Sequence, residues 1–185
     1  MVRVNSSFSR TCPVTSGIPQ GSCLGPLLFN LFINDITDHL PSSVKAKLFA
    51  DDLKIYTELS HCNQNLLQLQ LDLIQHWSQT WQMTISHSKC NILTMGHSRD
   101  HNQYFIDTNR IAKVEFTRDL GVTVDHELKF HSHINNIVQQ ANQRAAQISR
   151  CFLSRNPITL IRAFKIYIRP ILEYASTTWS PTCIH

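Results

Sequence analysis

The sequence predicts an α+β fold, with hairpins and helices mixed in residues 1–128 and helices alone in residues 129–185. Three observations predict it. Two short apolar runs flank a pair of acidic residues within residues 48–57, which is the pattern of a strand, a tight turn and a second strand. Large apolar residues recur at helical spacing between residues 66 and 81. The same spacing continues over about five turns in residues 134–152.

The first predicted helix begins at Pro26, because a proline needs no N–H partner at the first helical position. A helix that is apolar on nearly all sides must be covered by other parts of a protein, so we expect this one to be buried. Residues 16–29, where it begins, hold three glycines and two prolines, which predicts a loop with unusual backbone angles. The apolar residues of the helix are Leu27, Leu28, Phe29, Leu31, Phe32, Ile33 and Ile36.

The second predicted helix starts near Asn63 or Asn65 and places Trp77 and Trp81 in the core. Short strands are expected after it, with a turn bearing Lys89 between the first two. The expected strands are Met83–Ile85, Asn91–Met95, Tyr104–Asp107, Ile111–Phe116 and Leu120–Asp125.

The last part of the chain is predicted to be helical. After the long helix of residues 134–152, Asn156 and Pro157 are the cap and first residue of the next helix. Pro170 should kink or end that helix, because proline removes a helical hydrogen bond and its ring clashes with the preceding turn.

The segment Phe49-Ala50-Asp51-Asp52 places two adjacent carboxylates at the tip of the first predicted hairpin. Carboxylates this close repel each other, and a divalent cation relieves the repulsion. Acidic oxygen sites suit Mg²⁺ or Mn²⁺, and paired metals of this kind serve phosphoryl transfer. The alternative interpretation is an ordinary solvated turn.

Four motifs follow one another along the first part of the chain: Ser-Gly-Ile-Pro-Gln-Gly-Ser at 16–22, Leu-Gly-Pro-Leu-Leu-Phe at 24–29, Ile-Asn-Asp at 33–35 and Phe-Ala-Asp-Asp at 49–52. In this order and at these separations they resemble the reverse transcriptases of non-long-terminal-repeat (LINE-type) retrotransposons. Later stretches extend the resemblance to nearly the whole chain. They are Trp81–Ile85 with Ser88–Cys90, similar to a palm segment of that family, Asp119–Val122, similar to its primer-grip turn, and Arg169–Tyr174 with Trp179–Pro181, similar to the end of its thumb.

The resemblance implies a truncated polymerase palm in residues 1–128, followed by a thumb-like helical unit in residues 129–185. The implied reaction is RNA-templated DNA synthesis with two Mg²⁺ (or Mn²⁺) ions. The implied partners are an RNA template, a DNA primer and deoxynucleotides, with no membrane.

Site residues are carried over from the family motif by motif. Asp51 would bind metal, and Asp52 would support the metal site and the primer end. Lys89 is the candidate general acid for the pyrophosphate leaving group, or else an exposed lysine at a strand end. Residues of the glycine-rich loop would contact nucleotide and template: Gly17, Pro19, Gln20, Gly21 and Ser22. The primer grip would be Asp119, Leu120, Gly121 and Val122, and the duplex would be held by Arg150, Arg155, Arg162 and Lys165.

The chain also departs from the family pattern. Family members carry their first catalytic aspartate well before the glycine-rich loop, whereas none of residues 1–16 is acidic. We therefore expect an internal piece of a polymerase that is inactive alone. Two alternatives stay open: a non-catalytic remnant that binds nucleic acid, and a structural role unrelated to nucleic acid.

Charge and composition set further limits. The net charge of +4 is uneven, because residues 126–185 hold seven Lys or Arg against two Asp or Glu. Such an excess suits a phosphate backbone, although a solvated helix surface explains it equally well. No apolar run approaches the roughly 20 residues that span a bilayer, and no signal core is present, so we expect an intracellular chain, nuclear or cytoplasmic. Six scattered cysteines without a Cys-x-x-Cys pair argue against a zinc site.

Overall fold

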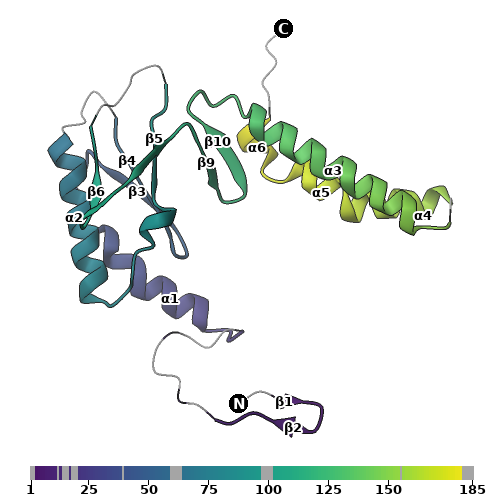
Figure 1. Cartoon of the computed structure of the whole chain (residues 1–185), viewed down its shortest axis with the longest axis horizontal. Helices are drawn as coiled ribbons and strands as arrows, with labels where there is room; N and C mark the ends of the chain where they lie inside the picture. Colours follow the sequence, from purple (N-terminus) through teal and green to yellow (C-terminus); the bar gives the residue numbers. More distant parts are fainter. Residues whose placement is uncertain are drawn as a thin grey trace. The chain divides into compact units, whose positions relative to one another are not determined.

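Helices and short two-stranded sheets alternate along the computed structural model, which confirms the predicted α+β class (Figure 1). The structure describes residues 3–11, 13, 17, 21–38, 40–58, 64–96, 102–154 and 156–180, with the backbone alone at 64 and 65. The chain divides into two compact units, Met1–Thr84 and Ile85–His185. The predicted boundary between palm and thumb at residue 128 falls inside the second unit and stays a prediction.

Within its described residues, the first unit contains two hairpins and two main helices. Strands β1 (Arg3–Val4) and β2 (Ser7–Phe8) form a short antiparallel pair near the start of the chain. Helix α1 (Gly25–Ile33) runs directly into the short 3-10 helix η1 (Asn34–Thr37). The second hairpin and helix α2 follow, with bounds β3 (Lys45–Phe49), β4 (Asp52–Tyr56) and α2 (Gln64–Thr80).

Helix α1 begins as predicted, with Pro26 in its first turn, but the expectation that it is buried is wrong. Ile33 is buried, whereas Leu27, Leu28 and Leu31 are 57%, 54% and 68% exposed. The reason is that α1 contacts other elements with one side only, so apolar character on the remaining sides does not bring burial. The helix therefore presents an uncovered apolar surface.

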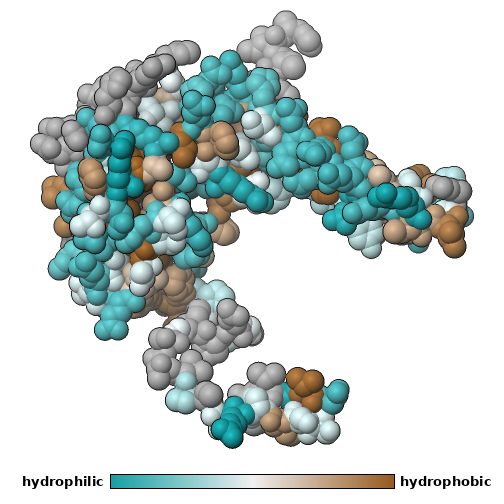
Figure 2. All heavy atoms as spheres, in the orientation of Figure 1, coloured by the Kyte–Doolittle hydropathy of each residue, from teal (hydrophilic) through white to brown (hydrophobic). Residues whose placement is uncertain are grey.

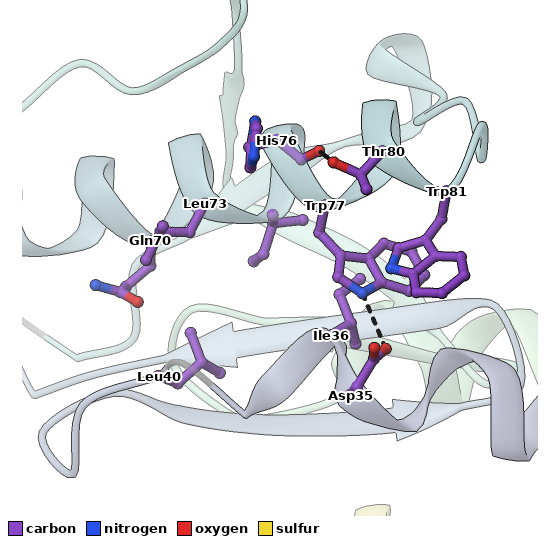
Figure 3. A pocket seen from close by; sticks show the side chains of 10 residues that line it. Asp35, Ile36, Leu40, Gln70, Leu73, His76, Trp77, Thr80 and Trp81 are labelled. Carbon is purple, nitrogen blue, oxygen red and sulfur yellow. Dashed lines mark hydrogen bonds between the residues drawn. The ribbon is translucent and has the colours of Figure 1, made fainter.

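Helix α2 packs against the end of α1 through aromatic side chains. The Phe32 ring meets the rings of Trp77 and Trp81 edge to face, with centroids 6.1 and 5.2 Å apart. The Trp77 indole Nε1–H donates a hydrogen bond to the Asp35 carboxylate at 2.9 Å (Figure 3). Trp77 is half-buried, but Trp81 is 46% exposed, so only the first of the two predicted core tryptophans is mostly covered.

A hollow of about 250 Å³ lies between η1 and α2. In Figure 3, Leu40 and Gln70 stand at one end of it and the Trp77–Asp35 hydrogen bond closes the other. Gln70 is buried, and its Oε1 atom has no hydrogen-bond partner in the described part of the chain. The Ile-Asn-Asp motif thus fixes the packing of α1 and η1 on α2 by means of Asp35.

The strands of the second unit are short. Strand β5 (Asn91–Leu93) pairs in parallel with β8 (Ala112–Val114), after the 3-10 helix η3 (His87–Lys89). The described residues of this unit also form two antiparallel hairpins, β6 (Phe105–Ile106) with β7 (Asn109–Arg110) and β9 (Phe116–Asp119) with β10 (Val122–Asp125). Tyr104, Ile106, Ile111 and Val122, in or next to these strands, are buried. The expected strand Met83–Ile85 is not formed, because this segment has no paired neighbour.

The described part of residues 131–180 forms four helices: α3 (His131–Cys151), α4 (Pro157–Tyr167), α5 (Arg169–Glu173) and α6 (Ser176–Trp179). The predicted cap is confirmed, since the Asn156 side chain accepts a hydrogen bond from the Ile158 N–H at 2.9 Å. Pro170 also acts as predicted, because α4 ends before it and α5 begins with it in the first turn. None of the helices in the described ranges is both long and apolar enough to cross a membrane.

Candidate functional site

The acidic pair lies at the tip of the β3–β4 hairpin, as predicted. Phe49 pairs with Asp52, so Ala50 and Asp51 form a two-residue loop and Asp52 is the first residue of β4. Asp51 and Asp52 are both exposed. Because a strand alternates its faces, Asp52 shares the exposed face of β4 with Lys54, while Leu53 turns inward. The turn thus presents two carboxylates to solvent from a hairpin anchored by its apolar inner face.

Ala50 adopts a backbone angle that alanine disfavours. Its φ is +52°, in the left-handed region that glycine enters without cost. Two-residue hairpin loops commonly need a positive φ at their first position, because this matches the twist of the paired strands. The hairpin therefore holds a strained residue directly before Asp51, and such strain often accompanies a functional turn.

The donor chemistry of the pair fits a hard divalent cation, since carboxylate oxygens are the ligands that Mg²⁺ prefers. Two carboxylates supply only part of a coordination shell. Among the described residues, no group of three or more His, Cys, Asp or Glu side chains lies close enough to hold a metal ion. The residues present can thus contribute to a metal site without completing it.

The glycine-rich loop is described only in part, and Pro19 and Gln20 lie outside the described residues. Gly17 and Gly21 have φ angles of +80° and +84°, which agrees with the unusual backbone angles expected there. The Ser22 hydroxyl accepts a hydrogen bond from the Gly25 N–H at 2.9 Å, next to the start of α1. Ser22 thus anchors the end of the loop to the helix.

Lys89 lies in the second unit, at the end of η3 rather than in an open turn. Its side chain is exposed, and its backbone N–H donates to the Ser86 carbonyl at 3.0 Å. The backbone is therefore fixed while the ammonium group stays in solvent. This placement is compatible with either interpretation of Lys89.

The segment Asp119–Val122, which resembles the primer-grip turn of the family, forms the turn of the β9–β10 hairpin. Asp119 pairs with Val122, and the loop residues Leu120 and Gly121 have φ angles of +44° and +90°. Positive φ at both loop positions is characteristic of the tight turn that matches the twist of a hairpin, although a leucine is strained in this conformation. The Tyr174 hydroxyl donates a hydrogen bond to the Leu120 carbonyl at 2.8 Å and so supports the strained residue from the helical side.

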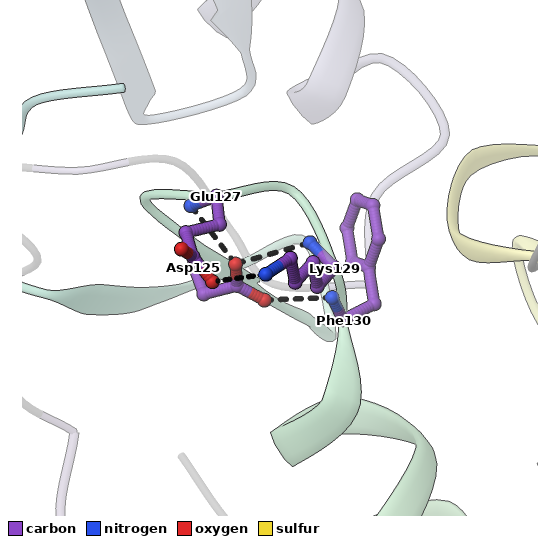
Figure 4. Close-up of polar contacts among 4 residues, drawn as sticks. All are labelled: Asp125, Glu127, Lys129 and Phe130. Atoms are coloured by element: carbon purple, nitrogen blue, oxygen red, sulfur yellow. Dashed lines mark hydrogen bonds and ion pairs between the residues drawn. The ribbon is translucent and has the colours of Figure 1, made fainter. Parts of the chain in front are cut away.

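The segment from β10 to α3 is organised around Asp125 (Figure 4). Its carboxylate accepts hydrogen bonds from the backbone N–H groups of Glu127, Lys129 and Phe130 at 3.0, 3.1 and 2.7 Å. Burial raises the pKa of the Asp125 carboxyl, but these hydrogen bonds and the charge of His126 outweigh it, so the pKa lies below its ordinary value. The segment is strained, since Leu128 and Phe130 have φ angles of +57° and +56°. Asp125 therefore fixes a tight connection between hairpin and helix.

His133 is a buried polar residue that belongs to none of the sequence motifs. It lies in the first turns of α3, is 3% exposed, and accepts the Thr123 N–H at Nδ1 over 3.3 Å. Burial, and then the charge of Arg118, lower the pKa of the His133 imidazole, which favours its neutral form. The signal was the helical stripe it shares with Ile137 and Ala141, both of which are buried.

Three of the four predicted duplex-binding residues lie on helices of the second unit. Arg150 on α3 and Arg162 and Lys165 on α4 are exposed, and Arg155 lies outside the described residues. Arg169, another basic residue of this unit, donates to the Glu173 carboxylate at 2.8 Å. Apolar side chains also reach the surface of α4, where Ile158, Ile161 and Ile166 are exposed (Figure 2). The face is therefore mixed rather than uniformly basic.

Comparison with known proteins identifies the family. Residues 1–149 match the family described as reverse transcriptase (RNA-dependent DNA polymerase). The chain is 29% identical over 185 residues to the RNA-directed DNA polymerase from mobile element jockey of Drosophila melanogaster, covering 94% of this chain and 20% of that protein. It is 27% identical over 192 residues to the probable RNA-directed DNA polymerase from transposon X-element of the same species, covering 98% of this chain and 21% of that protein.

A further relative is the probable RNA-directed DNA polymerase from transposon BS of Drosophila melanogaster, 28% identical over 199 residues that cover 97% of this chain and 21% of that protein. No solved structure matches the chain. The chain spans about a fifth of the length of these relatives. Because the family match covers most of its residues, the chain belongs to the reverse transcriptase family, and the resemblance to the enzymes of LINE-type retrotransposons is confirmed.

Proposed function

We propose that this chain is the part of a retrotransposon reverse transcriptase that carries the second half of the palm and the thumb. The observation that supports the proposal most directly is the pair Asp51 and Asp52, exposed at a strained two-residue turn, within a chain that matches the family over residues 1–149. In the parent enzyme this turn would face the primer end and the incoming deoxynucleotide on an RNA template. The metal would be Mg²⁺ or Mn²⁺.

The roles of the side chains follow from their chemistry. Asp51 and Asp52 would hold the divalent cation, which when bound supplies charge stabilisation for phosphoryl transfer. Lys89, exposed at the end of η3, would give a proton to the leaving pyrophosphate. The β9–β10 turn would position the primer strand through its backbone shape rather than through base identity. The loop residues Gly17, Pro19, Gln20, Gly21 and Ser22 would contact nucleotide and template.

The chain alone should not polymerise, because its described residues bring only two carboxylates to the acidic turn and two-metal chemistry needs more. The test is primer extension on an RNA template by the purified 185-residue chain with Mg²⁺ or Mn²⁺, beside the Asp51→Ala variant. No extension by either protein is expected. Templated incorporation that Asp51→Ala abolishes would contradict the proposed inactivity while supporting the role of Asp51.

Nucleic-acid binding is the second part of the proposal and is tested separately. Neutralising Arg150, Arg155, Arg162 and Lys165 together should weaken the affinity for a primer–template duplex. It should also flatten the plot of log affinity against log salt, by up to about 0.9 per lost contact on B-form DNA. Asp51→Asn is the control, because it should leave that slope unchanged. If the salt slope of the fourfold variant is unaltered, the four basic residues do not contact phosphates and form an ordinary solvated surface.

A further inference from the structure

Helix α1 and its N-cap Leu24 carry an apolar ridge on the side opposite the buried Ile33. Leu24 is 64% exposed, and Leu27, Leu28 and Leu31 are exposed to a similar degree. Positions three, four and seven residues apart lie on one side of a helix, so the four leucines form a continuous surface. An exposed apolar ridge of this kind marks an interaction surface.

The ridge offers a partner apolar contact and no ion pair. None of residues 24–34 is charged. The first acids after the helix are Asp35, whose carboxylate accepts the Trp77 N–H, and Asp38, which is exposed. A charged partner surface would lose its water at the ridge without gaining an opposite charge, and this is unfavourable. The matching partner is therefore apolar over the same area.

The ridge is complementary to a second copy of itself. The intervals between its leucines are three, one and three residues, so the spacing reads the same in both directions along the helix. Two antiparallel copies would place Leu24 of one opposite Leu31 of the other, and Leu27 and Leu28 would meet in the same way. Self-complementarity of this kind is what a two-fold symmetric pair requires. The antiparallel direction also opposes the helix dipoles and keeps the two Asp38 carboxylates at opposite ends.

The apolar area is sufficient for a reversible pair. Phe32 lies on the flank of the ridge beside Leu28, and its ring is 5.2 Å from that of Trp81, with both side chains partly exposed. Together with the four leucines, these two residues expose roughly 600 Å² per copy. Two copies would then bury about 1,200 Å², which is the lower end of specific interfaces. Such a dimer should dissociate on dilution.

We propose that the ridge of Leu24, Leu27, Leu28 and Leu31 is a dimerisation surface, on which a second copy of this chain docks with its α1 antiparallel to the first. The inference goes beyond the proposed function, because no nucleic acid, nucleotide or metal takes part in the contact. Failure of either proposal therefore leaves the other standing.

The test is sedimentation velocity of the full chain over a series of concentrations, in which the wild-type chain should pass from monomer to dimer. Leu24→Glu and Leu31→Lys, each alone, should weaken the dimer about tenfold or more, because symmetry places each new charge in the contact twice. Each charge suits its end of the helix dipole, so α1 should stay folded, which circular dichroism of the dilute chain checks. Ile158→Glu is the matched control, because Ile158 is 63% exposed in the first turn of α4. It should leave the dimer unchanged.

The double variant Leu24→Glu with Leu31→Lys decides the arrangement. In an antiparallel pair the introduced charges of opposite sign face each other, so the dimer should recover by about threefold or more relative to either single variant. In a parallel pair like charges would meet, and no recovery would follow. A wild-type chain that stays monomeric throughout the series would overturn the second copy as the occupant. A dimer that both single variants leave unchanged would overturn the surface, and a double variant without recovery would overturn the antiparallel pairing.

Discussion

Replacing Asp125 is expected to loosen the connection between the β9–β10 hairpin and helix α3. Asp125→Ala removes all three backbone hydrogen bonds, whereas Asp125→Asn keeps one acceptor oxygen and turns an N–H₂ group toward the Phe130 N–H. A lost capping side chain costs about 0.5–2 kcal/mol, and the strained Leu128 and Phe130 place Asp125→Ala near the upper end. We expect losses in the free energy of unfolding of about 2 kcal/mol for alanine and about 1 kcal/mol for asparagine.

The contribution of Asp125 to the free energy of unfolding depends on pH in a direction that its lowered pKa sets. Because the pKa of Asp125 is lowered by folding, its stabilisation is fully present above the unfolded value of about 3.9 and is lost as pH falls through the folded pKa below it. The advantage of the wild-type chain over Asp125→Asn should therefore shrink below pH 4 and stay constant above pH 5.

The assay for Asp125 is urea unfolding followed by circular dichroism, with amide hydrogen exchange at Lys129 and Phe130 as the local measurement. Glu127→Gln is the control, because the Glu127–Lys129 ion pair at 2.9 Å lies in the same segment but in solvent, and its loss should change little. Unchanged stability and unchanged exchange in Asp125→Ala would refute the reasoning.

Three further substitutions are expected to have measurable effects. Ala50→Gly should stabilise the chain by up to about 1 kcal/mol in urea unfolding, since glycine relieves the positive φ; a loss of stability would contradict the strained turn. Gly121→Ala should cost about 1–2 kcal/mol, because a Cβ there would meet Tyr174 Cε1 at 3.1 Å. It should cost more than Gly96→Ala, where φ is equally positive but nothing lies within 4 Å. Leu27→Gln should reduce aggregation in light scattering without lowering the melting temperature, since the side chain is 57% exposed.

Local patterns predicted most of the elements, because the forces that set them act over a few residues. The acidic hairpin followed from two alternating apolar runs, and the start of α4 followed from Asn156 and Pro157, whose chemistry suits a cap and a first turn. The expected strand Met83–Ile85 failed for the opposite reason. A strand needs a partner, and the β-forming tendency of three residues does not supply one.

Burial could not be predicted in the same way, because it depends on what the rest of the molecule places beside a residue. A helix that is apolar on most sides is expected to be buried by neighbouring parts of the chain. Leu31 on α1 is nevertheless 68% exposed. His133 is the reverse case. Polar side chains are mostly exposed, but the position of His133 four residues before Ile137 places it on the covered stripe of α3. The acidic turn and the β9–β10 turn were thus predicted as hairpin turns, and the burial of His133 beside the second turn was missed.

The side chains around the β9–β10 turn couple it to the helices by independent contacts. Tyr174 bonds to the Leu120 carbonyl from one side, and His133 accepts the Thr123 N–H from the other. Both contacts use backbone atoms of the hairpin, so they fix its position whatever its side chains are. Asp125 restrains the chain that links the two parts. A turn held in this way cannot shift without moving α3 and the end of α5. If the turn positions a primer strand as proposed above, that strand would follow any motion of those helices.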